Sequence, residues 1–226
     1  YEGSISLNLE AEQGTNYEVG ARGSFRELRF SYDLTTFYFK LDETIVQQPS
    51  GRNTTVVFEN TGATDQYGIE LSANWRILQN PARFLQNLDW QFSYTYHNFK
   101  FVDYQKEGND YSGNELTGVA PHTVVSVIKA KTEPGFYANL SYNFTDEIPL
   151  NDANTVYSNA YHLVQSRIGF KKELFENVNI DAYFGIDNLL DEKYSLGNDL
   201  NAFGDRFYQP AAPRNWFGGV KLNVEF

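Results

Sequence analysis

The chain has 226 residues, no cysteine and a formal net charge of −11. The lack of cysteine excludes disulfides, thiolate metal sites and cysteine nucleophiles, and the acidic balance argues against a nucleic-acid partner, which requires a basic surface. Aromatic residues make up 16% of the chain, yet no stretch approaches the roughly 18 consecutive apolar residues of a membrane helix.

Six stretches alternate apolar and polar residues with a period of two, as a β-strand does when only one face is apolar. In chain order, their apolar positions lie in residues 30–38, 67–75, 88–96, 136–144, 178–186 and 220–226. Weaker alternation predicts three more strands, in residues 17–21, 119–129 and 161–170. No segment combines a helical period with a capped start. The sequence therefore predicts about nine long strands.

The lengths of these strands and of the links between them favour one all-β fold. Several runs reach about ten residues, enough to cross a bilayer at a tilt, whereas the strands of a soluble β-sandwich also alternate but average about 5–6 residues. Short links (residues 23–26, 77–87, 131–134 and 172–177) alternate with long ones (residues 42–61, 103–118, 146–159 and 188–212). This pattern is typical of outer-membrane barrels. We expect an antiparallel transmembrane β-barrel meander.

Aromatic side chains near the short links indicate where the lipid headgroups lie. Trp75 and Trp90 flank the same short link, and the terminal Phe226 lies at the same edge of the meander. By the outer-membrane pattern this edge is periplasmic, so these three residues are expected to belong to an aromatic girdle at the membrane interface. Ordinary packing is the alternative for the two tryptophans.

The last 43 residues carry the most specific motifs. Residues 184–194 (FGIDNLLDEKY) and 206–216 (RFYQPAAPRNW), followed by the terminal strand, resemble the C-terminal end of TonB-dependent outer-membrane receptors. Residues 12–22 and 60–70 look like mid-barrel strands of the same receptors, so the resemblance covers essentially the whole chain. Within it, two loop segments look closest to receptors of Bacteroidetes-type bacteria, residues 148–155 and 194–201.

The resemblance implies a barrel of roughly 22 strands with an N-terminal plug domain and a short box that contacts the TonB energy-transducing complex. Nine strands cannot close such a barrel, and position 1 is not methionine. We therefore expect residues 1–226 to be the C-terminal part of a receptor barrel, with the plug and the earlier strands outside this chain. The implied place is the outer membrane of a Gram-negative bacterium, and the implied partners are outer-membrane lipid, the TonB complex and a small-molecule ligand.

The sequence contains no catalytic constellation. His97, His122 and His162 fall in separate predicted strands, with His97 on the polar face, and no Gly-x-Ser-x-Gly elbow is present. We predict that the protein is not an enzyme and that it needs neither a cofactor nor a metal site.

The long loops supply the candidate ligand-binding residues, which are Arg206, Tyr208, Arg214, Asp152 and Asp199. The guanidinium groups could grip an anionic ligand such as a ferric chelate, or they could pair with acids such as Asp187. The carboxylates, with neighbouring asparagines, could hold Ca²⁺. Their spacing matches no known calcium loop, so solvated surface is the favoured interpretation.

Three functions fit these observations. The first is an energised importer of a ferric siderophore or similar metal chelate. The second is an oligosaccharide or peptide importer of the same superfamily with a surface lipoprotein partner, in which Tyr104, Tyr111 and Tyr157 could stack on sugars. The third is a small stand-alone barrel that acts as an adhesin or a passive pore.

Overall fold

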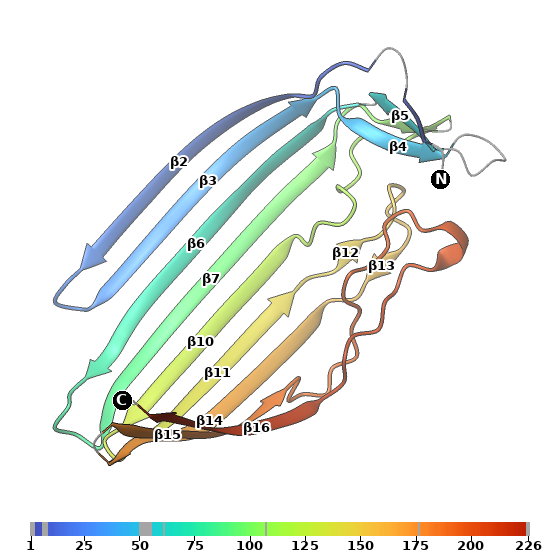
Figure 1. The fold of residues 1–226 in the computed structure, drawn as a ribbon. Coiled ribbons are helices and arrows are strands. Elements are labelled where there is room, and N and C mark those ends of the chain that lie inside the picture. The colour runs from blue at the N-terminus through green and yellow to red at the C-terminus, as the bar shows by residue number, and fades with distance from the viewer. Residues whose placement is uncertain are drawn as a thin grey trace.

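Nine long strands form one sheet in the computed structural model, which describes residues 3–5, 9–49, 56–60, 62–106, 108–175 and 177–224. The nine are β2 (Gln13–Phe25), β3 (Phe30–Asp42), β6 (Thr64–Gln79), β7 (Leu85–Phe101), β10 (His122–Thr132), β11 (Phe136–Thr145), β14 (Tyr161–Phe175), β15 (Val178–Asp187) and β16 (Asn215–Val224). Each pairs antiparallel with the next in chain order, so the sheet is a meander with β2 and β16 at its edges (Figure 1). The predicted all-β antiparallel meander is confirmed.

The connections between these strands alternate between short and long, as the sequence predicts. Short turns join β2 to β3, β6 to β7, β10 to β11 and β14 to β15, all at the lower end in Figure 1. The long connections lie at the other end and carry short elements of their own. These are β4 (Ile45–Pro49), β5 (Val56–Asn60), β8 (Gln105–Lys106), β9 (Asn109–Asp110), β12 (Ile148–Pro149), β13 (Tyr157–Ser158) and the 3-10 helix η1 (Phe203–Asp205). A further short strand, β1 (Gly3–Ile5), precedes β2 and pairs with β5.

The strands extend further towards the short turns than the alternation predicts. The pairing of β6 with β7 continues past a register shift between Arg76 and Leu78, and that of β14 with β15 continues past a shift between Glu173 and Phe175. A bulge of this kind breaks the period of two without ending the strand. The links β6–β7 and β14–β15 are therefore shorter than expected. At the other end of its strand, β10 begins at His122, later than the predicted residue 119.

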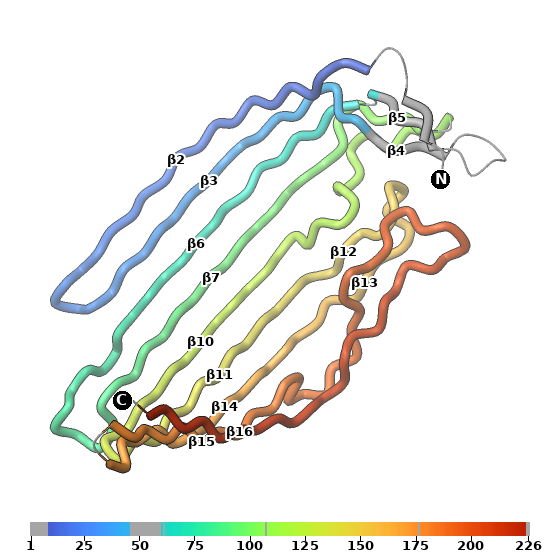
Figure 2. The backbone as a smooth tube through the Cα atoms, viewed as in Figure 1, coloured from blue at the N-terminus to red at the C-terminus, as the bar shows by residue number. Residues whose placement is uncertain are grey.

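The register places the apolar positions of all nine strands on one face. One row of cross-strand neighbours, for example, runs through Phe30, Trp75, Trp90, Ile128 and Leu140. Such a row is continuous only if the strands are paired so that their apolar residues all face the same side of the sheet. A slip of one residue would turn the side chains of a strand to the other face. Figure 2 shows that the sheet is a curved wall rather than a flat one.

The opposite face is polar and holds side-chain pairs between neighbouring strands. Arg76 on β6 pairs with Asp89 on β7 at 2.7 Å, and Arg22 on β2 lies 3.8 Å from Asp33 on β3. No helix among the described residues is long and apolar enough to cross a membrane.

Trp75 and Trp90 are direct cross-strand partners on the apolar face, next to the short turns. The Trp75 indole N–H donates to the Leu28 carbonyl in a turn at 3.1 Å, and the Trp90 indole N–H donates to Ser126 Oγ at 3.0 Å. This position suits a membrane-interface girdle, which stays a prediction. Phe226, the third predicted member, lies outside the described residues.

Candidate functional site

The long connections, rather than the wall, contain most of the buried side chains. Leu150 is fully buried, Tyr104 is 2% exposed and Phe207 is 5% exposed. These three residues come from the connections β7–β10, β11–β14 and β15–β16. The three connections therefore pack together, and we call them the loop cluster.

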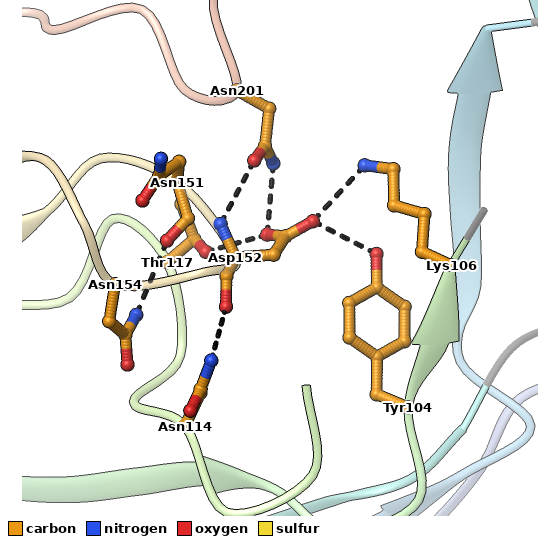
Figure 3. A network of polar contacts seen from close by, with 8 residues as sticks. All are labelled: Tyr104, Lys106, Asn114, Thr117, Asn151, Asp152, Asn154 and Asn201. Carbon is orange, nitrogen blue, oxygen red and sulfur yellow. Dashed lines mark hydrogen bonds and ion pairs between the residues drawn. The ribbon is translucent and has the colours of Figure 1, made fainter. Parts of the chain in front are cut away.

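Asp152 is the centre of the loop cluster (Figure 3). Its side chain is buried, and its Oδ2 accepts hydrogen bonds from the Tyr104 hydroxyl at 3.0 Å and from the Lys106 ammonium at 3.1 Å. Its Oδ1 accepts from the Thr117 hydroxyl at 2.6 Å and from the Asn201 amide at 2.9 Å. Both carboxylate oxygens are therefore used by contacts inside the cluster.

The backbone of Asp152 extends the same network. Its N–H donates to Asn201 Oδ1 at 3.0 Å, and its carbonyl accepts from Asn114 Nδ2 at 2.8 Å. Nearby, Asn154 Oδ1 accepts from the Glu115 N–H at 2.7 Å and its Nδ2 donates to the Glu115 carbonyl at 3.1 Å. Asp152 thus joins three connections that are far apart in the sequence.

The charge of Asp152 is compensated although the carboxylate is buried. Burial alone would raise its pKa, but the hydrogen bonds from Thr117 and Asn201 and the charge of Lys106 outweigh burial and hold the pKa below its usual value. Burial and the neighbouring carboxylate raise the pKa of Tyr104. Asp152 is therefore ionised and Tyr104 neutral at physiological pH.

The interpretation of the loop carboxylates as solvated surface is wrong for Asp152, which is 5% exposed. The physical reason is that donors from three connections replace water around its oxygens. A role for Asp152 in ligand binding stays a prediction, but its contacts point to a structural role. Among the described residues, no group of three His, Cys, Asp or Glu side chains is arranged to hold a metal ion.

The other four candidates lie exposed on the connection β15–β16, which is the last long loop. The Tyr208 side chain is half exposed and its hydroxyl donates to the Tyr157 carbonyl at 3.0 Å. Asp199 accepts from the Gln209 amide at 3.1 Å. Arg206 and Arg214 are exposed, and no ion pair within the described residues involves either guanidinium, so the alternative pairing with Asp187 is not observed.

An aromatic patch on the polar face went unnoticed in the sequence. Phe37, His97 and Phe99 lie near the loop end of β3 and β7, with ring centroids 4.6 Å apart for His97 and Phe99 and 6.1 Å for Phe37 and Phe99. We call these three residues the lumen patch. The sequence does contain a signal for this patch, because both phenylalanines stand at alternate positions that are otherwise mainly polar in their strands. The Phe99 carbonyl also accepts from the Leu116 N–H at 2.9 Å, which ties the patch to the loop cluster.

The three tyrosines considered for sugar stacking are only partly available. Tyr104 is buried, its ring centroid lies 5.9 Å from that of Tyr111, and Tyr111 and Tyr157 are half-buried. The three histidines lie apart, as expected: His97 is on the polar face, while His122 and His162 each accept or donate a hydrogen bond through Nδ1 with a tyrosine on the apolar face.

Comparison with known proteins identifies the family to which this chain belongs. A sequence model of the family described as "TonB dependent receptor-like, beta-barrel" matches residues 2–189. The chain is 25% identical over 194 residues to the pesticin receptor of Yersinia pestis, covering 84% of this chain and 26% of that protein. The chain therefore spans about a quarter of the length of this curated relative.

Two solved structures show the same fold over nearly the whole chain. The ferric yersiniabactin uptake receptor FyuA from Yersinia pestis superposes with a TM-score of 0.69 at 22% identity, covering 95% of this chain and 30% of that one. The unliganded ferric citrate transporter FecA superposes with a TM-score of 0.72 at 17% identity, covering 95% and 31%. In both cases the chain corresponds to less than a third of the solved chain.

Proposed function

This chain belongs to the TonB-dependent receptor-like β-barrel family, and we propose that it forms the ligand-capturing C-terminal part of an outer-membrane importer. The family is one of outer-membrane receptors of Gram-negative bacteria, not of enzymes. The apolar face of the sheet accordingly contacts lipid, and the polar face lines the barrel interior. By the same pattern, the short turns are periplasmic and the loop cluster is external.

The observation that carries the proposal is the exposure of two guanidinium groups, Arg206 and Arg214, on the last external loop, where neither forms an ion pair with another described residue. They suit an anionic ligand, because a guanidinium donates two parallel hydrogen bonds to a carboxylate or a similar oxygen pair. Tyr208 and Asp199 share this loop and are the remaining proposed contacts. The lumen patch, below the loops, offers ring surface to an aromatic or apolar part of the ligand.

We assign the ligand to the class of ferric siderophores and similar metal chelates. Relatives named for ferric yersiniabactin uptake and ferric citrate transport support this class. Import of such a bulky solute is proposed to need the TonB complex, which would act through a plug domain that lies outside this chain.

Binding by the full-length protein tests the proposal. Ferric citrate and a panel of ferric siderophores are titrated while tryptophan fluorescence is recorded, and uptake of radioactive iron is measured in cells with and without TonB. We expect one chelate to bind and to enter only with TonB. Replacing both Arg206 and Arg214 with alanine should weaken its binding, since each charge-assisted contact contributes about 1.5–3 kcal/mol.

The matched control is Arg83→Ala, which removes an exposed arginine from a short turn at the opposite end of the barrel. This variant should bind the chelate as the unaltered protein does. The proposal fails if none of the chelates binds, or if uptake is equal without TonB.

A further inference from the structure

A hollow lies on the lipid-facing surface, close to the short turn between β10 and β11. Its volume is about 690 Å³, and the surface that lines it is almost entirely apolar. Three alanines from three different strands alternate there with large aromatic side chains, and this difference in size creates the hollow. On this face it is lined by Ala130, Ala138, Ala182, Phe136, Phe170 and Phe184.

The register shows that these side chains all lie on the lipid-facing side of the sheet. Ala130 pairs with Ala138, and Phe136 pairs with Phe170, which in turn pairs with Ala182. The hollow is therefore continuous with the apolar surface that contacts the membrane. An acyl chain is the apolar molecule that this surface meets in a bilayer.

A single cation marks the periplasmic end of the hollow. Lys172 follows Phe170 by two residues on β14, so it lies on the same face about 7 Å further towards the turn. Its cross-strand neighbour Ile180 is apolar, and Ile180 pairs in turn with Leu222. Within the described residues Lys172 has no ion pair.

The neighbouring turn adds charge of both signs. A second, smaller hollow of about 330 Å³ at the end of the wall is lined by Lys131, Lys171 and Lys172 together with Glu133 and Glu173. Of the three lysines, Lys131 and Lys171 belong to the polar face, where Lys171 is the cross-strand partner of Asp181, so Lys172 is the one on the lipid-facing side. Lys172 lies at the level where phospholipid headgroups meet the short turns.

We propose that the lipid-facing hollow binds an acyl chain of an anionic phospholipid from the periplasmic leaflet, whose phosphate contacts Lys172. The hollow supplies the space for the chain, and the lysine next to it supplies the charge complementarity. This inference concerns the lipid-facing side of the wall and is independent of the ligand that the external loops capture.

Native mass spectrometry of the full-length protein tests the inference. The protein is released from nanodiscs that contain equal amounts of phosphatidylglycerol and phosphatidylcholine with identical acyl chains. We expect the unaltered protein to retain phosphatidylglycerol preferentially. Lys172→Gln should reduce that preference about fivefold, and Ala138→Phe should reduce the retention of both lipids severalfold because it fills the hollow.

Two variants of the same kind at other places serve as controls. Lys100→Gln removes a lysine from the lipid-facing parity of β7 at the loop end, and Ala21→Phe adds a ring to the lipid-facing parity of β2. Neither should change the lipid retained. If Ala138→Phe does not give the heat-dependent gel shift of a folded barrel, Ala182→Leu fills the same hollow with a smaller group.

Three results would overturn the inference. The first is equal retention of the two phospholipids by the unaltered protein, and the second is unchanged retention when the hollow is filled. The third is that lipopolysaccharide, and no phospholipid, remains bound.

Discussion

Asp152 organises the loop cluster, so its replacement tests how the external loops are held. Asp152→Ala leaves Lys106 without its counter-ion and removes the acceptor for Tyr104, Thr117 and Asn201. Removing one partner of a buried ion pair costs about 3–5 kcal/mol. We expect amide hydrogen exchange to accelerate in the connections β7–β10 and β15–β16 together, while the amides of β6 and β7 stay protected.

Two further variants make this prediction specific. Asp152→Asn keeps one acceptor oxygen but turns a donor towards Lys106 or Thr117, so its effect should be intermediate. Asp199→Ala removes an exposed carboxylate from the last loop and should leave exchange unchanged. Local acceleration confined to the connection β11–β14 would contradict the view that Asp152 joins three connections.

The lowered pKa of Asp152 also predicts how the cluster responds to acid. A carboxyl group whose pKa is lowered by folding stabilises the fold above its unfolded pKa, near 3.9, and this stabilisation is lost as the pH falls through the lower folded-state pKa. We expect hydroxyl-radical labelling of Tyr104 to stay low from pH 7 to about 4 and to rise below that pH. In Asp152→Asn the labelling should be nearly independent of pH over this range, and an equally steep rise in that variant would contradict the assignment.

At the scale of the strands, aromatic side chains on the polar face cover glycines of the neighbouring strand. Tyr137 on β11 lies over Gly169 on β14, Tyr183 on β15 lies over Gly219 on β16, and each aromatic residue is the direct cross-strand partner of its glycine. A Cβ atom on either glycine would collide with the ring. The glycines therefore provide space for the tyrosines to lie flat against the barrel interior, which strengthens cross-strand contact.

Gly169→Val tests this arrangement. The valine would displace the Tyr137 ring and break the hydrogen bond from its hydroxyl to Asp181, which is 2.8 Å long. Overpacking of this kind costs about 1–3 kcal/mol, so we expect the barrel to unfold at a lower urea concentration. With Tyr137→Ala already present, Gly169→Val should cost little, because no ring remains to collide. Additive effects of the two substitutions would show that the ring and the glycine do not interact.

The alternation of residues predicted β3, β6 and β7 because a wall between lipid and water imposes one chemical requirement on each face. That requirement weakens near the short turns, where bulges change the parity, as at Arg76 and Leu78, and the predicted boundaries were wrong there. The lumen patch was missed for a related reason. Phe37 and Phe99 each stand at a polar-face position of one strand. Only the pairing of β3, β6 and β7 shows that the two rings lie close together.

At the scale of the whole chain, the loop cluster was beyond the reach of sequence reasoning. The hydrogen-bond partners of Asp152 in the loop cluster lie 35 to 49 positions away in the sequence. No local period relates such residues, and an acidic loop residue is normally solvated. Arg206 and Arg214, in contrast, were proposed from their position in the last long loop alone, and their role in ligand binding stays a prediction.

The two edge strands lead to the last prediction. In the described residues β2 pairs only with β3, and β16 only with β15, so the outer backbone groups of both edges lack partners in this sheet. An unsatisfied backbone group in lipid costs several kcal/mol, and each edge offers a row of them along 13 residues of β2 and 10 of β16. We expect further strands of a longer protein to pair with both edges. Hydrogen exchange checks this: the amides of β2 and β16 should be as protected as those of β7 in the full-length protein and should exchange quickly when residues 1–226 are refolded alone. Equal protection in the isolated segment would show that its edges find partners in other copies or in each other, and the proposed place in a larger barrel would lose its main physical support.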